Sequence, residues 1–219
     1  MSERPKESWG SGDAYELWVG RWSRIVGESF VDWLAIPPGQ TWGDVGWGTG
    51  ALAESILGRS DPAGVLGVDR SEAYVCEARN RVGDARARFE VGDACALPWT
   101  TATCDVTVSG LVLNFVPDSD AMVHEMLRVT RPGGRVAAYV WDYAGGMQMI
   151  RHFWDVALAL NRDDAQLDQA ERFPLCQPGP LEQLFRRVGL VSVSVRAIDV
   201  TTVFRDFGDY WRPFLGTQA

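Results

Sequence analysis

The run Asp44-Val45-Gly46-Trp47-Gly48-Thr49-Gly50 constrains this chain more than any other stretch. It follows a short apolar lead-in, and residues 51–57 after it have the composition of a helix. Glycine lets the backbone turn sharply and lets a ligand approach without meeting a Cβ. The start of a helix offers unpaired N–H groups to a polar or anionic group. A strand, a glycine turn and a helix in this order predict a cofactor loop in an α/β fold.

The glycine loop matches two cofactor patterns. Gly46, Gly48 and Ala51 satisfy the dinucleotide pattern G-x-G-x-x-G/A. A second pattern places an acid two residues before the first glycine and a third glycine two residues after the second. Asp44 and Gly50 complete that pattern. The loop by itself leaves both cofactor classes open.

The composition narrows the class of protein. A chain of 219 residues is long enough for one α/β domain with additions. Its formal net charge of −8 argues against non-specific binding to nucleic acid or anionic membranes. The polar start lacks a signal-peptide core, and no apolar run reaches the roughly 20 residues that a membrane span needs. We therefore expect a cytoplasmic protein without a nucleic-acid or membrane partner.

The cysteines give no sign of a metal site. Cys76, Cys95, Cys104 and Cys176 form no CxxC pair and have no histidine at ligand spacing. This spacing predicts reduced thiols and no metal cofactor.

Apolar runs separated by turn signals predict six strands that alternate with helices. The first strand lies around Trp42 and Gly43, and the others are 65–69, 88–91, 105–113, 135–141 and 190–198. Helical spacing predicts helices over 13–34, 51–57, 71–82, 117–129, 147–160 and 177–188, the last closed by Gly189. Residues 204–215 fit a short aromatic helix or a loop. This order favours an α/β, Rossmann-like, doubly wound and mostly parallel sheet.

Two acids follow predicted strands and face the same edge of such a sheet. Asp69 ends the second strand, nineteen residues beyond Gly50, where a carboxylate reaches an adenosine ribose. A strand-end acid in solvent, or a helix cap before Ser71, is the alternative for Asp69. Asp93, beside Ala94, follows the third strand and can take an adenine amine, or it is a simple loop acid.

The second half of this region resembles a known family. The runs CDVTVSGLVLNFVPD and MLRVTRPGGRVAAYVWD resemble the fourth strand, helix, R-P-G-G turn and fifth strand of class I S-adenosylmethionine (SAM)-dependent methyltransferases. With the glycine loop and the strand-end acids, the resemblance covers roughly residues 13–145, and it is similar to the ubiquinone/menaquinone-type, small-molecule group. It implies methyl transfer from SAM, which leaves S-adenosyl-L-homocysteine (SAH), to a small organic acceptor. It assigns cofactor contacts to Asp44, Gly46, Gly48, Gly50, Asp69, Arg70, Asp93, Ala94 and Ser109. Trp47 in the loop is a further candidate contact, and Tyr15 and Arg21 are added if the first helix caps the cofactor.

The same resemblance divides the chain into three parts. Residues 1–40 form an N-terminal helical cap, or a helix packed on the domain edge. Residues 41–145 form the SAM-binding core. Residues 146–219 hold a lid helix or plain core helix, the last helix and the sixth strand.

The sequence departs from the family at two places. The family sheet ends in a seventh, antiparallel strand, and no such strand is found after Ile198. An uncovered sheet edge favours pairing, so we expect a monomer or a homodimer. Trp47 stands where the family has a small residue, so it either stacks near the methionine part of SAM or obstructs it. Gly43 is interpreted as the small residue that makes room for Trp47.

Methyl transfer needs no particular catalytic residue, because orientation in a water-poor site supplies much of the catalysis. His152 is a candidate general base or a lid-surface residue, and Tyr143 or Asn114 are candidates for orienting the acceptor. The chain carries no Ser-His-Asp set and no P-loop lysine. Two alternatives remain: an NAD(P)-dependent oxidoreductase and a catalytically silent SAM-fold binding protein.

Overall fold

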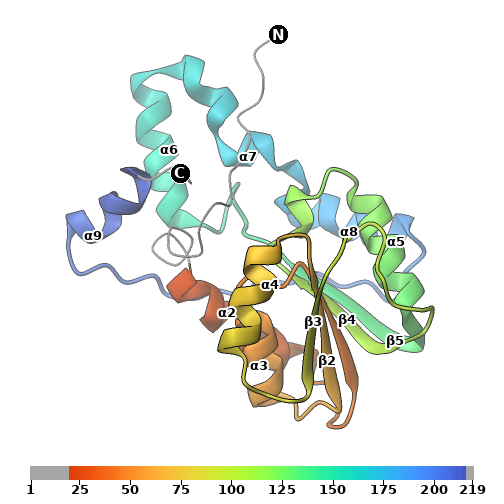
Figure 1. Ribbon diagram of the computed structural model, residues 1–219. Coiled ribbons are helices and arrows are strands. Elements are labelled where there is room, and N and C mark those ends of the chain that lie inside the picture. Colours follow the sequence, from red (N-terminus) through yellow and green to blue (C-terminus); the bar gives the residue numbers. More distant parts are fainter. Residues whose placement is uncertain (1–19, 216–219) are drawn as a thin grey trace.

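Five parallel strands form one sheet in the order β3-β2-β1-β4-β5 (Figure 1). The computed structural model describes residues 20–215. The strands are β1 (Thr41–Val45), β2 (Gly64–Asp69), β3 (Ala87–Val91), β4 (Cys104–Gly110) and β5 (Thr130–Tyr139). The central strands are covered on both faces, which is why they carry runs of buried residues. This arrangement confirms the predicted Rossmann-like, doubly wound fold.

Helices follow the strands at the predicted places. The α-helices are α2 (Arg21–Leu34), α3 (Ala51–Arg59), α4 (Glu72–Arg81), α5 (Ser119–Val129), α6 (Gln148–Leu160), α7 (Gln169–Arg172), α8 (Pro178–Arg187) and α9 (Phe207–Trp211). Short 3-10 turns are η2 (Leu113–Phe115), η3 (Arg162–Leu167), η4 (Pro174–Cys176) and η5 (Arg212–Leu215). Ser71 and Asp118 cap α4 and α5 by accepting from backbone N–H groups. Gly189, with a φ of 103°, ends α8 as predicted.

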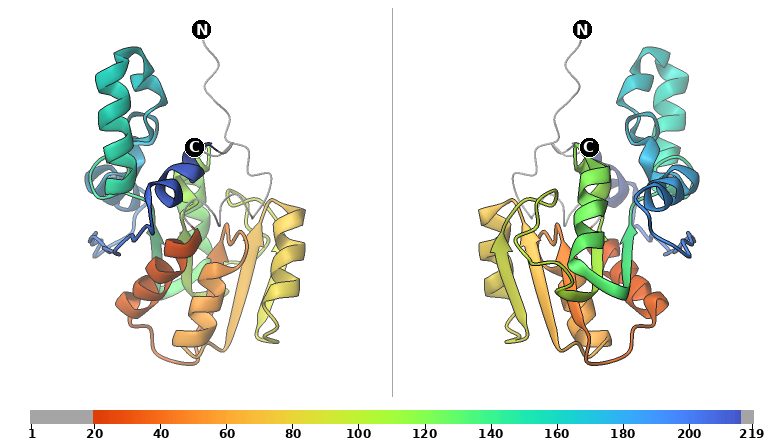
Figure 2. Two further views of the ribbon diagram at one scale, coloured as in Figure 1. Left: turned by 90° about the vertical axis from the view of Figure 1, so that its left-hand side faces the viewer. Right: turned by 90° about the vertical axis from the view of Figure 1, so that its right-hand side faces the viewer.

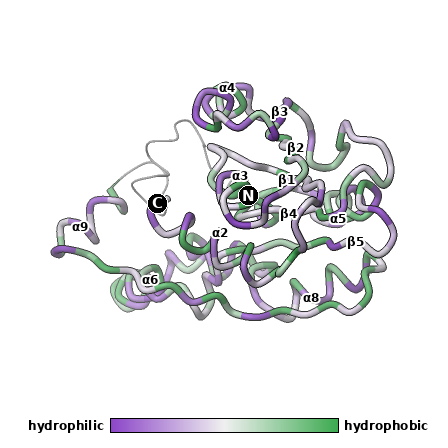
Figure 3. The backbone as a smooth tube through the Cα atoms, turned by 90° about the horizontal axis from the view of Figure 1, so that it is seen from below, coloured by the Kyte–Doolittle hydropathy of each residue, from purple (hydrophilic) through white to green (hydrophobic). Residues whose placement is uncertain are grey.

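Two apolar layers cover the two faces of the sheet (Figures 2 and 3). On one face, α2, α3 and α4 contribute buried side chains such as Phe30, Ile56 and Val75. On the other face, α5 and α8 contribute Met126 and Leu184. The loops at the ends of the strands are therefore held by a core on each side.

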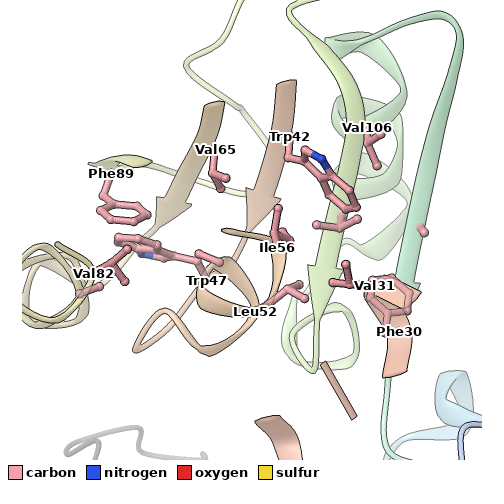
Figure 4. Close-up of a cluster of buried hydrophobic side chains, with 14 of the residues drawn as sticks. Phe30, Val31, Trp42, Trp47, Leu52, Ile56, Val65, Val82, Phe89 and Val106 are labelled. Carbon is pink, nitrogen blue, oxygen red and sulfur yellow. The ribbon is translucent and has the colours of Figure 1, made fainter. Parts of the chain in front are cut away.

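Glycines inside the sheet accommodate two buried tryptophans. Trp47 is only 4% exposed and packs against Phe89 (Figure 4). A Cβ on Gly67 would lie 2.7 Å from the Trp47 ring, so Gly67 makes room for it. A Cβ on Gly43 would lie 2.9 Å from Trp99 instead. The interpretation that Gly43 compensates for Trp47 is therefore wrong, because the two residues pack against different neighbours.

The far edge of the sheet differs from the prediction. Residues 190–198 form no strand. Leu190 and Val193 pack on one apolar layer and Ile198 on the other, whereas Val191 and Val195 are exposed, and no backbone hydrogen bond joins the segment to β5. The predicted sixth strand is thus wrong, and the alternating valines do not mark one buried side. Residues 20–215 contain no seventh strand either, so β5 is an edge strand.

The R-P-G-G turn is built into β5. The strand begins already at Thr130 and its pairing with β4 shifts register between Cys104 and Val106. A Cβ on Gly134 would lie 2.5 Å from the carbonyl oxygen of Asp105, so the two backbones approach closely there. The predicted turn therefore serves as a bulge at the start of the strand.

The helices α6, α7 and α9, which follow β5, project from one end of the sheet (Figures 1 and 2). Asp168, which is buried, pairs with Arg151 of α6. Tyr210 of α9 donates to the carbonyl oxygen of Met149 at 2.8 Å. Asp209 accepts from Arg21 at 3.3 Å, which ties α9 to α2. None of the helices in residues 20–215 has the length and apolar character needed to cross a membrane.

Candidate functional site

A cavity of about 1000 Å³ opens at the carboxyl ends of the strands. Its walls come from four loops, each following one strand: 46–49 after β1, 69–71 after β2, 92–95 after β3 and 111–118 after β4. The carboxyl ends of neighbouring parallel strands meet at the same edge of a sheet, so residues distant in the chain converge there. This edge is the one that the sequence predicted for ligand binding.

The glycine loop has the backbone that its sequence predicts. Gly46, Gly48 and Gly50 all have positive φ, at 75°, 55° and 90°. A Cβ on Gly46 would lie 2.5 Å from Val112, which excludes any side chain there. Gly48 has open space where a Cβ would lie and it lines the cavity. Gly50 instead stands at the start of α3 and does not line the cavity.

Asp44 carries an unusual carboxyl group for the end of a buried strand. Its side chain is fully buried, lines the cavity, and neither oxygen has a hydrogen-bond partner within residues 20–215. Burial, and then the negative charge of Asp69, raise the pKa of the Asp44 carboxyl to about 8. A buried polar group without a partner is costly, which is why such groups are rare away from ligand sites. The cavity therefore presents an acid that suits a cationic or hydrogen-bond-donating ligand.

Asp69 connects two of the loops. Its carboxylate accepts from the N–H of Gly48 at 3.0 Å and from the N–H of Ser71 at 2.9 Å. These bonds orient the side chain at the cavity wall and leave lone pairs for a ligand hydroxyl. Ser71, rather than Asp69, is the N-cap of α4, and Asp69 lines the cavity.

Asp93 and Ala94 also line the cavity. The Asp93 carboxylate accepts from the N–H of Cys95 at 2.8 Å, which makes a tight turn after β3. Arg70 also lines the cavity beside Asp69. Ser109 is buried beneath it, and its hydroxyl donates to the carbonyl oxygen of Val45 at 2.8 Å. Ser109 therefore joins β4 to β1 below the cavity and lies outside its lining.

Several other predicted residues lie away from the cavity lining. Arg21 pairs with Asp209 and stacks over the Trp22 ring at 4.1 Å. Tyr15 lies outside the described residues. Tyr143 is buried against Phe173.

The remaining catalytic candidates are also outside the lining. His152 is exposed on α6, and Asn114 is in η2, where its amide nitrogen is buried without a partner within residues 20–215. Neither side chain lines the cavity, although Phe115 beside Asn114 does.

The cavity contains residues that sequence reasoning did not select. Leu111 has a φ of 60°, a strained conformation for a residue with a Cβ, and its N–H donates to the carbonyl oxygen of Tyr139 at 2.9 Å. Tyr139 lies over Gly110, where a Cβ would be 2.5 Å from its hydroxyl oxygen. Tyr139 lines this cavity and also a second groove beside β5. Tyr139 reaches the cavity because β5 pairs with β4 so that Tyr139 lies opposite Gly110. A local sequence pattern does not reveal this pairing, so it could not identify Tyr139 as a cavity residue.

Within residues 20–215, no group of three or more histidine, cysteine or acidic side chains could hold a metal ion. The four cysteines are free thiols.

Comparisons with known proteins agree with this geometry. Residues 43–138 match the family model of the methyltransferase domain. The ubiquinone/menaquinone biosynthesis C-methyltransferase of Cereibacter sphaeroides is 37% identical over 131 residues, which cover 58% of this chain and 49% of that protein. The 2-methyl-6-phytyl-1,4-hydroquinone methyltransferase of a Synechocystis species is 33% identical over 121 residues, which cover 55% of this chain and 38% of that protein.

A solved structure extends the likeness of the fold. The phosphoethanolamine N-methyltransferase 2 of Haemonchus contortus, solved with SAM, superimposes with a TM-score of 0.63 at 21% identity, over 82% of this chain and 41% of that one. This chain spans about half the length, or less, of the curated relatives that it matches. The matched residues include the glycine loop and the strand-end acids that line the cavity. Residues 43–138 are therefore those of a methyltransferase domain, and the chain around them has the class I, SAM-dependent methyltransferase fold.

Proposed function

We propose that this chain binds SAM in the cavity at the strand ends and transfers its methyl group to a small organic acceptor. The observation that carries the proposal is Asp44, a fully buried acid with two partnerless oxygens at a cavity wall. The ammonium group of SAM is a cation that would supply the missing partner. The open space at Gly48 and the oriented carboxylate of Asp69 support the same ligand.

Each loop has a part in holding SAM under this proposal. Asp44 takes the ammonium group, and the glycine loop lies against the methionine end. Asp69 takes the ribose hydroxyls with Arg70 beside it, and Asp93 with the N–H of Ala94 reads the adenine. Gly50 and Ser109 act indirectly, because they shape the loop and the strand under it.

When bound, SAM supplies an electrophilic methyl group for an in-line displacement. The chain contributes orientation and exclusion of water. Leu111, Val112 and Phe115 give the β4 side of the cavity an apolar wall, which favours a dry site. The acceptor's atom, oxygen, nitrogen or carbon, stays open, as do the roles proposed for His152, Tyr143 and Asn114.

The relatives support a small-molecule acceptor, because two of them are named as methyltransferases of quinone-type compounds. The net charge of −8 supports a function without nucleic acid. We expect the protein to work in the cytoplasm as a monomer or a homodimer, with residues 1–40 as a cap and α6 as part of a lid. Sedimentation velocity tests the oligomeric state.

Calorimetric titration of SAM, SAH and NADH tests the proposal directly. We expect binding of both adenosyl ligands and none of NADH, with weaker SAH binding by Asp44→Asn and Asp69→Asn. Asp155→Asn, an acid-to-amide change on the exposed side of α6, is the matched control and should bind SAH normally. Preferential NADH binding would contradict the proposal in favour of the oxidoreductase. SAM binding without methyl transfer to any acceptor in a broad screen would favour the silent binding protein.

A further inference from the structure

One part of the cofactor cavity lies on the face of the sheet that α2 and α3 cover (Figure 1). Side chains along a strand alternate between the two faces. Trp42 of β1 belongs to the apolar layer on this face, so Asp44, two residues later, points to the same face. Tyr139 of β5 packs on that layer too. We call this part of the cavity the α2 lobe, and it is lined by Ser23, Asp44, Leu52, Gly110 and Tyr139.

The structure holds the hydroxyl group of Tyr139 at a fixed place in the α2 lobe. A Cβ on Gly110 would lie 2.5 Å from the hydroxyl oxygen, and a Cβ on Gly27 of α2 would lie 3.5 Å from it. The ring packs against Phe30 of α2, with 4.7 Å between the ring centroids. The carbonyl oxygen of Tyr139 accepts from the N–H of Leu111 at 2.9 Å. The hydroxyl oxygen therefore lies between β4 and α2, where the missing side chain of Gly110 leaves room for it.

The α2 lobe contains one acid and no cation. Asp44 lines it with two carboxyl oxygens that have no partner within residues 20–215. The Ser23 hydroxyl donates to the carbonyl oxygen of Gly20 at 2.9 Å, so its proton is already used. Arg70 is the only cationic side chain among residues 20–215 that lines the cavity, and it follows β2, on the other side of β1 from the lobe. An anionic group in the lobe would therefore need neutral hydrogen-bond donors.

The amino-acid end of SAM brings such an anionic group into the lobe. Under the proposed function, on which this inference rests, the ammonium group pairs with Asp44. The ammonium and carboxylate groups of SAM are attached to one carbon atom, so the carboxylate enters the same lobe. A carboxylate removed from water without donors is costly. A phenol hydroxyl is a donor, and the first turn of α3, which begins at Ala51 on the cavity wall, adds a favourable dipole.

We propose that the Tyr139 hydroxyl donates a hydrogen bond to the carboxylate of SAM and of SAH. The amino-acid end is then held from two strands, by Asp44 of β1 through its ammonium group and by Tyr139 of β5 through its carboxylate. Contact with the methyl acceptor is the rival role for Tyr139. The geometry favours the cofactor, because an acceptor at this hydroxyl would compete with the amino-acid end for the lobe that contains Asp44.

Calorimetric titration of the whole chain with SAH and two analogues tests the proposal. Decarboxylated SAH lacks the carboxylate, and deaminated SAH lacks the ammonium group. The carboxylate preference is the factor by which SAH binds more tightly than decarboxylated SAH, and the amino preference is the same factor for deaminated SAH. The unchanged chain should have a carboxylate preference of at least about tenfold, because hydrogen bonds to charged groups are strong.

The variant Tyr139→Phe should lower the carboxylate preference by about tenfold and leave the amino preference unchanged. Asp44→Asn should do the opposite and lower the amino preference. Tyr74→Phe is the matched control, because it removes the hydroxyl of another tyrosine that lines the cavity, on α4. Its carboxylate preference should equal that of the unchanged chain.

The possible failures are distinguishable. An unchanged carboxylate preference in Tyr139→Phe overturns this inference alone and leaves the acceptor role for Tyr139. A fall in the amino preference instead would put the hydroxyl at the ammonium group. An equal loss in Tyr74→Phe would show that the effect is not specific to Tyr139. If the unchanged chain does not bind SAH at all, the proposed function fails and this inference fails with it.

The variant Gly110→Ala adds an independent check that keeps the phenol. Its new Cβ would lie 2.5 Å from the Tyr139 hydroxyl oxygen, so the hydroxyl must move. A direct clash of the new methyl group with the ligand weakens SAH and decarboxylated SAH alike, whereas displacement of the hydroxyl lowers the carboxylate preference. A lower carboxylate preference is expected, and an unchanged one contradicts the position assigned to the hydroxyl.

Discussion

The affinity of this chain for SAH should rise with pH because of Asp44. Burial holds the pKa of the Asp44 carboxyl at about 8 in the free protein. The ligand's ammonium group pairs with the ionised carboxylate, so binding below that pH must also release a proton. The ionised fraction grows from about one in a hundred at pH 6 to about a quarter at pH 7.5, so affinity should grow roughly twentyfold.

Calorimetry measures this effect in two ways. The dissociation constant is followed from pH 6 to pH 7.5, and titrations in two buffers with different heats of ionisation give the number of protons released. Close to one proton should be released near pH 7, because Asp44 is mostly protonated before binding. The variant Asp44→Asn should bind SAH with an affinity that depends little on pH, and its binding should release almost no protons. A flat profile for the unchanged chain, or an equal slope in Asp44→Asn, would refute the reasoning.

The same carboxyl should make the free energy of unfolding fall as pH rises, which is the opposite of its effect on ligand affinity. Its pKa is raised from 3.8 to about 8 in the folded chain, so folding takes up a proton. The stability of the ligand-free protein is therefore lost progressively as pH rises from about 4 to about 8, by at most about 5 kcal/mol. Asp44→Asn removes this cost and should raise the urea midpoint at pH 8 while changing it little at pH 4. A lower midpoint at pH 8 would show that Asp44 has partners that compensate its burial.

Three further predictions concern packing. Gly67→Ala should lower the free energy of unfolding, measured by urea denaturation, by about 1–3 kcal/mol, because the added Cβ meets the Trp47 ring at 2.7 Å. The loss should be smaller when Trp47 is also replaced by alanine, and an equal loss would contradict the contact. Trp47→Cys should lower stability by about 3 kcal/mol or more, because it empties a buried site; an unchanged urea midpoint would place the ring elsewhere. Asp168→Ala leaves Arg151 without its buried partner, so proteolysis between α6 and α7 should accelerate, with Asp155→Asn as the unaffected control.

Much of the sheet could be predicted because strands, helices and turns alternate with clear local signals. The glycine loop and the acids after β2 and β3 were predictable for the same reason, since topology brings strand ends together. The burial of Asp44 was not predictable, because it depends on the layers of helix that cover both faces. Its position was visible in the sequence, but its raised pKa was not.

The predicted sixth strand failed for a physical reason. The alternation of valines at residues 190–198 predicts one buried side, but Val191 and Val195 are exposed. A strand also needs a neighbouring backbone within hydrogen-bonding distance, and no local pattern gives that distance. The partner of Trp47 was missed similarly, because Gly67 meets it only through the pairing of β1 with β2.

His152 illustrates a signal that the sequence did contain. Ile150 and Trp154 are the buried positions of α6, four residues apart, and His152 lies midway between them. At 3.6 residues per turn, a residue midway between two buried ones faces the opposite side. The helical period thus predicts the exposed position that His152 occupies.

Among residues 20–215, Tyr139 is the one residue that lines both the cofactor cavity and the groove beside β5. A molecule in the groove and a ligand in the cavity would both meet this ring. If a molecule in the groove moves Tyr139 and so changes the affinity of the cavity for its ligand, that ligand changes the affinity of the groove for the molecule by the same factor, because the two bindings share one thermodynamic cycle. Such a molecule would act as an effector of cofactor binding.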